Sequence, residues 1–306
     1  MIDSPLLQPG QLEAPAGDFP ELRLPSATLF RKRSQRFYQL AEGHSLSDYL
    51  HFLAVLAEHQ QRELDNHPGI PVPDTTQLQG CRIGAKPPLD ATSQSRHPHW
   101  RQVARNLANA VFDKTPKGGQ EEMALLYDSE EKWLDVQADN LLARKFHRIN
   151  LATAPIIGAA LQIQWTYLTR QLGALPTAWQ VQPTHCPVCG GHPVASVIRK
   201  EGAVNGLRYL HCALCGSEWH MVRSKCSNCM NTKDVTYYGI EGRKDIINAE
   251  TCPVCLSYLK VIHQDREPRI EPAADDLASF DLDLLMGEKN IAKNGINFMM
   301  IQGQEE

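Results

Sequence analysis

Four Cys-x-x-Cys pairs in the second half of the chain constrain its fold more than any other feature. A shift of 40 residues lays the first two pairs onto the last two: Cys186/Cys189 and Cys212/Cys215 onto Cys226/Cys229 and Cys252/Cys255. Each repeat reads C-x2-C-x22-C-x2-C. Two such pairs facing each other across a loop can present four thiolates to one tetrahedral metal ion. The spacing therefore predicts two four-cysteine metal sites in tandem.

In the expected sequential pairing each repeat closes its own site: Cys186, Cys189, Cys212 and Cys215 in the first, and Cys226, Cys229, Cys252 and Cys255 in the second. An interleaved pairing is the alternative, although the repeat favours two similar hairpin units. Each Cys-x-x-Cys pair forms a tight turn, which we call a knuckle. The knuckles do not select the metal, because rubredoxins and zinc ribbons share them. On the spacing alone, structural zinc is favoured over iron.

The residue that follows the second cysteine of each pair differs between the repeats. Gly190 and Gly216 occupy this position in the first repeat, whereas Met230 and Leu256 occupy it in the second. Glycine readily adopts the left-handed backbone that lets amide hydrogens point at the sulfur atoms. We therefore expect the second site to receive fewer amide hydrogen bonds and to be the weaker or more labile one.

Length and composition fit a globular protein of about two domains. The 306 residues are 42% hydrophobic and 22% charged, and the formal net charge is −4. No segment reaches the roughly 18 apolar residues that a membrane span needs. The N-terminal residues lack the basic start and apolar run of a signal peptide. We therefore expect a cytoplasmic protein without membrane insertion, whose cysteines bind metal or carry out redox chemistry rather than form a disulfide framework.

Helical patterns dominate the first half of the chain. Apolar residues recur at helical spacing in a segment that Ser47 can cap, and further helices are expected near 98–113, 120–147 and 155–173. The last of these is apolar on nearly all sides, as in the central helix of a bundle. A proline-containing loop is expected between the first two, after His67.

Short strand-like runs replace the helical pattern in the cysteine region, at 194–199, 207–211 and 235–240. Near the C-terminus, Asp275 or Asp276 can cap a final helix. This helix is expected to turn four apolar residues inward: Leu277, Phe280, Leu284 and Leu285. The expected fold class is α+β multidomain: an N-terminal helical bundle, two tandem rubredoxin-like or zinc-ribbon four-cysteine modules, and a C-terminal helix. The expected parts are a proline-rich arm (1–27), a helical domain (28–180), two four-cysteine modules (181–225 and 226–265) and a tail with a helix (266–306).

Nucleic-acid binding is disfavoured by the charge of the cysteine region. Residues 181–260 contain nine Lys or Arg and six Asp or Glu, a charge of +3. Two filled tetrathiolate sites of −2 each bring the total to about −1, a poor match for a phosphate backbone. We interpret the cations, including Arg199 and Arg208, as neutralising the thiolates or as solvated surface. Three histidines near the knuckles are candidate hydrogen-bond donors or spare ligands, although eight thiolates leave little need for further ligands: His185, His211 and His220. Trp219 is expected to shield a site.

The chain carries no P-loop, Rossmann glycine fingerprint, zinc-protease motif or nucleophile elbow. We therefore expect it not to be an enzyme.

Three segments of the chain resemble the FdhE family of accessory proteins for formate dehydrogenase assembly. They are INLATAPIIGAALQIQW, HCPVCGGHPVASVIR with GLRYLHCALCGSEWHMVRSKCSNC, and DDLASFDLDLLMGEKNI. The central motif is specific, because it includes residues between the cysteines as well as their spacing. All eight cysteines of the four pairs match the family pattern.

The resemblance implies a cytoplasmic, non-catalytic maturation factor. Such a protein contacts the catalytic subunit of respiratory formate dehydrogenase before its export by the twin-arginine route. The family's association with rubredoxin-like centres implies iron in two tetrathiolate sites, with zinc as the alternative, and a redox-responsive role is chemically reasonable. The alternatives are a rubredoxin-type electron carrier or oxidoreductase, and a zinc-ribbon nucleic-acid module.

Overall fold

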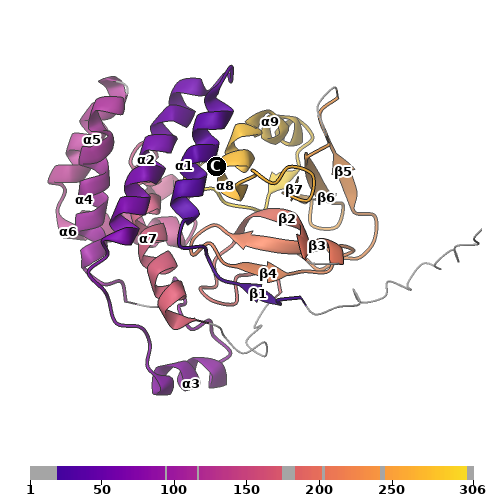
Figure 1. Cartoon of the computed structure of the whole chain (residues 1–306), viewed down its shortest axis with the longest axis horizontal. Coiled ribbons are helices and arrows are strands. Elements are labelled where there is room, and N and C mark those ends of the chain that lie inside the picture. Colours follow the sequence, from indigo (N-terminus) through magenta and orange to yellow (C-terminus); the bar gives the residue numbers. More distant parts are fainter. Residues whose placement is uncertain are drawn as a thin grey trace, which may run out of the picture.

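The protein is described by a computed structural model over residues 19–93, 95–115, 117–173, 183–201, 204–241 and 245–301. Helices gather on one side and strands on the other, with the last two helices packed against the sheet (Figure 1). This arrangement agrees with the predicted α+β class and its order along the chain. The proline-rich arm expected at 1–27 lies mostly outside the described residues.

The helices of the first half follow the apolar pattern closely. They are α1 (Leu29–Ala41), α2 (Ser47–Asp65), α3 (Thr75–Ile83), α4 (His99–Val111), α5 (Lys117–Asp128), α6 (Glu131–Leu142) and α7 (Ala154–Leu172), with 3-10 turns at Phe112–Lys114 and Phe146–Arg148. The single helix expected at 120–147 is in fact α5 and α6. Ser47 does not cap α2: the N-cap is Leu46, which makes no side-chain cap hydrogen bond.

Helix α3 lies inside the segment that was expected to be a loop. Asp74 accepts a hydrogen bond from the amide of Gln77, whose side chain in turn accepts one from the amide of Asp74. This reciprocal capping box stabilises the start of a helix that buries none of its residues. In Figure 1 the helix stands apart from the bundle, below α7.

Helix α7 is the centre of the bundle, as its apolar sequence predicts. It packs against α2, α4 and α6, and its side chains from Ala154 to Thr166 are all buried. Gly158 lets Phe298 approach, because a Cβ there would lie 2.7 Å from the Phe298 Cβ. Gln162 donates a hydrogen bond to the carbonyl of Ala213, which connects α7 to the first cysteine repeat.

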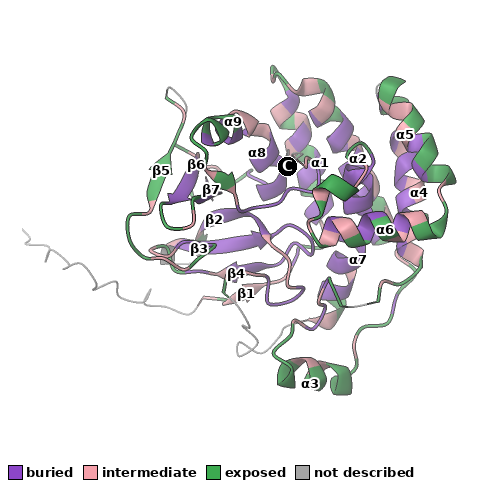
Figure 2. Ribbon diagram, turned by 180° about the vertical axis from the view of Figure 1, so that it is seen from behind, coloured by how far each residue is buried: buried purple, intermediate pink, exposed green. Residues whose placement is uncertain are grey.

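The strands of both repeats form one sheet in the order β1-β4-β3-β2-β7-β6-β5, with β8 beside β7. The strands are β1 (Leu22–Arg23), β2 (Pro193–Glu201), β3 (Val204–Cys212), β4 (Glu218–His220), β5 (Thr236–Tyr238), β6 (Ile247–Cys252), β7 (Ser257–His263) and β8 (Ala292–Lys293). Each repeat supplies three antiparallel strands, and the parallel pairing of β2 with β7 joins the repeats. Most residues of β6 and β7 are buried, whereas β5 is exposed (Figure 2).

The C-terminal region forms two short helices, α8 (Pro272–Ala278) and α9 (Phe280–Glu288). Glu271 caps α8 by accepting a hydrogen bond from the amide of Ala274, so neither Asp275 nor Asp276 has the predicted capping role. Leu284 and Leu285 are exposed, contrary to the prediction. The buried face of α9 carries Leu282, Asp283 and Met286 instead, because Asp283 accepts hydrogen bonds from Tyr258 and Lys260.

One hydrophobic core extends from the helical bundle into the first repeat. It includes Leu50 and Trp165 from the helices together with Val188 and Leu214 from the knuckles. Backbone hydrogen bonds add to this contact, because the amides of Leu89 and Ala91 donate to the carbonyls of Val188 and Cys189. The first repeat is therefore anchored on the helices, and the domain boundaries given above remain a prediction.

Candidate metal centres

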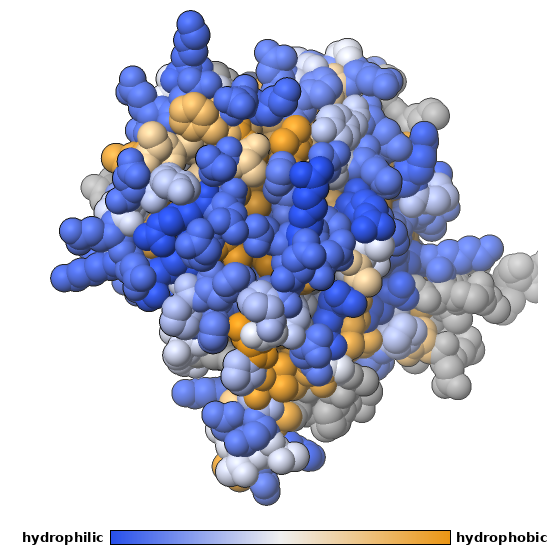
Figure 3. All heavy atoms as spheres, turned by 60° about the vertical axis from the view of Figure 1, so that its left-hand side comes forward, coloured by the Kyte–Doolittle hydropathy of each residue, from blue (hydrophilic) through white to orange (hydrophobic). Residues whose placement is uncertain are grey.

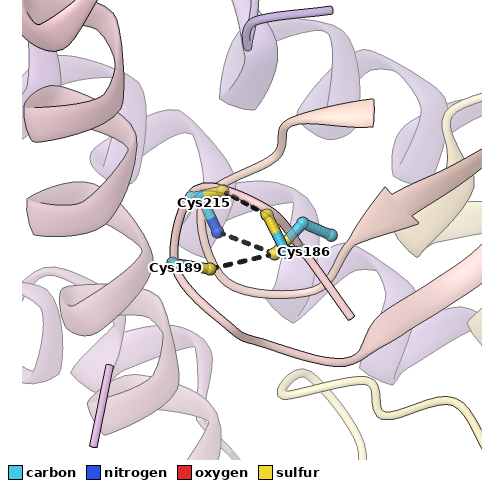
Figure 4. Close-up of side chains that lie close together, drawn as sticks. Cys186, Cys189 and Cys215 are labelled. Atoms are coloured by element: carbon cyan, nitrogen blue, oxygen red, sulfur yellow. Dashed lines mark hydrogen bonds between the residues drawn. The ribbon is translucent and has the colours of Figure 1, made fainter. Parts of the chain in front are cut away.

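The two repeats place their cysteines in the same way. In each, one Cys-x-x-Cys knuckle precedes the first strand, and the other forms the turn between the second and third strands, β3 and β4 or β6 and β7. The sulfur atoms gather in two groups: Cys186, Cys189, Cys212 and Cys215 in the first cluster, and Cys226, Cys229, Cys252 and Cys255 in the second. The grouping is sequential rather than interleaved. Figure 4 shows three side chains of the first cluster pointing toward one another.

The spacing of the sulfur atoms fits a tetrahedral ion. In the first cluster the Sγ atoms of Cys186 and Cys215 are 3.6 Å apart, and those of Cys189 and Cys212 are 3.4 Å apart. The corresponding distances in the second cluster are 3.7 and 3.6 Å. A tetrahedron with metal–sulfur bonds of about 2.3 Å has sulfur–sulfur edges of about 3.8 Å. The cysteines are free thiols, so each cluster could hold one metal ion.

The knuckles share one backbone conformation even where their sequences differ. The residue after the second cysteine has a positive φ in all four: 70° at Gly190, 72° at Gly216, 64° at Met230 and 51° at Leu256. The left-handed region carries little cost for glycine, but about 1 kcal/mol or more for other residues. The second repeat therefore keeps the turn and bears strain at two positions where the first has none.

Packing explains why the first repeat uses glycine. A Cβ on Gly216 would lie 2.6 Å from Leu29 Cδ2 and 3.3 Å from Pro25 Cβ, and one on Gly190 would lie 3.3 Å from Pro87 Cγ. The corresponding Leu256 of the second repeat is 61% exposed. The first pair of knuckles is therefore covered by the helical part of the protein, whereas the last knuckle projects into solvent.

The two clusters differ most in exposure. All four cysteines of the first cluster are buried, whereas in the second Cys229 is exposed and Cys255 is half-buried. The neighbouring Val254 is 68% exposed, so the open cluster also has an apolar rim. A buried site exchanges its ion only when the surrounding structure opens, whereas a chelator or a protein partner can reach an exposed thiolate directly. The second cluster is thus the accessible one.

Amide hydrogen bonds reach sulfur atoms in both clusters. In the first, the amides of Leu214 and Cys215 both donate to Cys212 Sγ at 3.4 Å. In the second, the amide of Asn228 donates to Cys226 Sγ at 3.3 Å, and the Asn231 side chain to Cys252 Sγ at 3.6 Å. Both repeats thus support their sulfurs in this way, although the second relies partly on a side chain.

Burial and hydrogen bonding together shift the pKa values of the metal-free thiols. Burial alone would raise the pKa of Cys252, but amide donors from Cys255 and Val254 lower it to about 6. In the first cluster burial raises the pKa of Cys186 and of Cys189 well above the usual value. A metal must therefore displace the protons of Cys186 and Cys189, so its binding to the first cluster is pH-dependent.

The cations near the knuckles pair with carboxylates rather than with sulfur. Arg199 donates two hydrogen bonds to Glu218, and Arg208 donates to Glu250 at 2.7 Å. Neither arginine has a described hydrogen bond to a sulfur, and Arg208 is buried, so it is not solvated surface. Their role in neutralising the thiolates stays a prediction. Trp219 is buried in the core cluster that contains the first knuckles, and its indole donates to the carbonyl of Pro183.

The nearby histidines do not donate to sulfur among the described contacts. His211 hydrogen-bonds to Glu218 through Nδ1, and His185 contacts the hydroxyl of Thr184 and the ring of His192. His220 lies 3.8 Å from a Glu21 carboxylate oxygen. Both predicted metal groups thus consist of cysteines alone.

Comparison with known proteins supplies the family. Three family models match in order along the chain: the FdhE N-terminal model at residues 19–178, the FdhE central domain at 185–223 and the FdhE C-terminal domain at 224–300. The chain belongs to the FdhE family. The N-terminal model ends at residue 178, the central model begins one residue before Cys186, and the central and C-terminal models meet between residues 223 and 224.

Relatives in the FdhE family match over nearly the whole chain. FdhE homologues from Yersinia pestis (strain Pestoides F) and Yersinia enterocolitica are 37% identical over 295 residues, covering 94% of each chain. The crystal structure of the FdhE protein from Pseudomonas aeruginosa has 34% sequence identity and a TM-score of 0.79, over 93% of this chain and all of that one. The resemblance noted in the sequence is therefore confirmed. None of the described helices has the length and apolarity of a membrane span.

Proposed function

We propose that this FdhE protein is an accessory factor for the assembly of respiratory formate dehydrogenase. It binds the catalytic subunit in the cytoplasm before export by the twin-arginine route, and catalyses no reaction itself. Family membership over the whole length supports this role. The observation that carries the proposal furthest is the pair of four-cysteine clusters held in one sheet, one buried and one open to solvent.

We further propose that each cluster binds one iron ion through its four cysteines. An iron ion held by four thiolates can accept one electron from a protein donor and change its charge by one, without a change of ligands. Around the open second cluster, such a charge change would act on the surface formed by Val254 and Leu256, both exposed. Client affinity would then depend on the redox state of this cluster.

The test is a pull-down of the formate dehydrogenase catalytic subunit with affinity-tagged protein, from cells in which export is blocked. The role predicts co-purification of the subunit with the wild-type protein, and weaker recovery when Cys226 and Cys229 are both replaced by Ser. The matched control replaces Cys81, which lies in neither cluster. Failure of the wild-type protein to retain the subunit would contradict the assembly role.

A rubredoxin-type electron carrier is the second candidate, and the exposure of Cys229 favours it. A carrier needs only the open cluster and does not need a helical bundle as large as α1–α7. Rapid reduction and reoxidation with a flavoprotein reductase, without binding of the catalytic subunit, would support the carrier over the assembly factor.

A further inference from the structure

A small cavity lies between the turn that follows α6, helices α8 and α9, and the C-terminal segment after α9; we name it the α9 cavity. Its volume is about 230 Å³. The exposed residues Gly287 and Ala292 form part of its wall, so the cavity is open to solvent on that side. No sulfur of either cluster lines it, so the α9 cavity is separate from the candidate metal centres.

Most side chains that line the α9 cavity are apolar or already paired. Lys293 donates a hydrogen bond to Asp276 at 2.8 Å, and Tyr258 donates one to Asp283 at 2.6 Å. Lys260 also donates to Asp283, so two lysines balance two aspartates and this network has no net charge. The larger apolar residues of the wall are Phe146, Leu277, Phe280, Ile291, Ile296, Met300 and Ile301.

Arg144 also lines the α9 cavity, and it has no carboxylate partner among the described residues. Its Nη1 atom lies 3.2 Å from Nδ1 and 3.3 Å from Nε2 of His192. The half-buried guanidinium keeps three N–H donors on Nε and Nη2 without a described partner. Neither atom belongs to the fully buried polar atoms that lack a partner, so a ligand can reach both. Arg144 therefore gives the cavity an uncommitted positive charge.

The backbone at Arg144 is one that glycine usually adopts. Arg144 directly follows Ala143, the C-cap of α6, and its φ is 58°. The amide of Arg144 donates to the carbonyl of Leu141, and the amide of Lys145 donates to that of Asn140. Glycine is preferred at this position of a helix end, and a left-handed arginine is strained. The turn alone does not explain the arginine, so its side chain requires another role.

Surface exposure does not explain the arginine either. Hydrophilic residues cover most of the helical side of the protein, and an unpaired charge among them is fully hydrated (Figure 3). The Arg144 guanidinium is instead half-buried, and burial lowers its pKa because no neighbouring carboxylate offsets the loss of water. A charge removed from water in this way is stabilised by an anion.

We propose that the α9 cavity binds a small organic acid, whose carboxylate pairs with Arg144 and whose apolar body lies among the apolar side chains of the wall. The planar guanidinium can present two parallel N–H groups, one on Nε and one on Nη2, to the two oxygens of a carboxylate. Phosphate has no apolar part to fill the rest of the cavity. The small volume favours a free acid over the end of a polypeptide. This inference does not depend on which metal the clusters hold.

The binding test uses the full-length, metal-loaded protein and 4-fluorophenylacetate, followed by 19F NMR. Saturable binding is expected, and Arg144→Gln should raise the Kd by about tenfold or more. Arg148→Gln is the matched control, because it removes the same charge at an exposed position four residues later, outside the cavity lining. It should change the Kd less than about twofold. Equal weakening by both variants, or no saturable binding, would overturn the proposal.

A second variant separates ligand binding from folding. Arg144→Gly removes the guanidinium but suits the left-handed turn, so its midpoint of thermal unfolding should be no lower than that of the wild-type protein. Its Kd should rise as in Arg144→Gln. A lower midpoint together with unchanged binding by the folded variant would show that the side chain supports the fold, and would overturn its role in binding the acid.

Three competitors test the class of ligand. The neutral 2-(4-fluorophenyl)ethanol should bind the wild-type protein about tenfold or more weakly than the acid, and should not distinguish it from Arg144→Gln. Phosphate that displaces the acid at equal concentration would overturn the apolar acid in favour of a simple anion site. Tighter binding of N-acetyl-4-fluorophenylalanine, which resembles the carboxyl end of a peptide, would overturn the free acid in favour of a polypeptide terminus.

Discussion

Arg208 of β3 and Glu250 of β6 form a buried ion pair between the two cysteine repeats, with 2.7 Å between Nη2 and Oε1. The two side chains are 1% and 3% exposed. Arg208 also donates to Ser196 and to the carbonyl of Lys225, while the other Glu250 oxygen accepts from Tyr237. Because every partner lies in the sheet or next to a knuckle, the pair fixes the position of the second repeat relative to the first.

Replacing Glu250 by Gln should destabilise the metal-loaded protein by about 3 kcal/mol or more, because Arg208 would keep its charge without a carboxylate. The double change Arg208→Met with Glu250→Leu should cost less than the single change, since it removes both buried charges. Denaturant unfolding followed by circular dichroism measures both. A double variant less stable than the single one would show that the pair stabilises the protein beyond the cost of an unpaired charge.

Exchanging residues at the positive-φ positions should destabilise the first repeat more than the second. Leu256→Gly relieves backbone strain at an exposed site, so its free energy of unfolding should stay within about 1 kcal/mol of wild type. Gly216→Ala should cost about 1–3 kcal/mol, because its Cβ would meet Leu29 in the core. Thermal unfolding with metal analysis tests both. A larger loss for Leu256→Gly than for Gly216→Ala would contradict the packing account.

The two metal ions should leave at different rates when a chelator is added. The open cluster with exposed Cys229 should release its ion at least about tenfold faster than the buried cluster, because the latter requires local unfolding. Release can be followed by the absorbance of a chelator complex. The double Ser variant of Cys226 and Cys229 should retain only the slow phase. Identical rates for both ions would show that the difference in burial does not control access.

Acid should weaken the protein through Glu218. Its pKa falls from the ordinary 4.5 to about 2 in the fold, so its contribution is complete above about pH 4.5 and is lost as the pH falls toward 2. This difference corresponds to about 3 kcal/mol. The stability gap between the wild-type protein and Glu218→Gln should therefore narrow between pH 4.5 and 3. Acid also releases metal, but it does so from both proteins, so comparing their free energies of unfolding removes that effect. A difference in free energy that stays constant over this pH range would contradict this account.

Local patterns predicted much of this fold. The apolar stripes of α2 and α4 are visible in the sequence because a helix repeats its buried positions every three or four residues. Helix α7 is recognisable because it is apolar on nearly all sides. The left-handed turns at Gly190 and Gly216 were also predictable from residue type. Two elements that were not predicted could have been found from the sequence. Asp74 and Gln77 match a capping box, which indicates the start of helix α3. The 40-residue shift lays strand β3 onto residues 244–252, which include strand β6 (Ile247–Cys252).

Long-range relationships were not predictable in this way. The parallel pairing of Ser196 with Val261, which merges the repeats into one sheet, joins residues of different repeats and has no local signature. The inward turn of Asp283 likewise depends on Lys260, a residue on another element. The difference in exposure between the clusters arises because Leu29, Pro25 and Pro87 cover only the first. Cysteine spacing carries no information about that cover.

The most direct test of the account is the metal content of anaerobically purified protein, measured by elemental analysis together with a visible spectrum. The two clusters predict two irons per chain and ferric–thiolate absorption that bleaches on reduction. The Cys186→Ser and Cys226→Ser variants should each lose one iron. Two zinc ions per chain and no colour would contradict iron-based redox sensing, and would leave the clusters as structural sites that support a partner-binding surface.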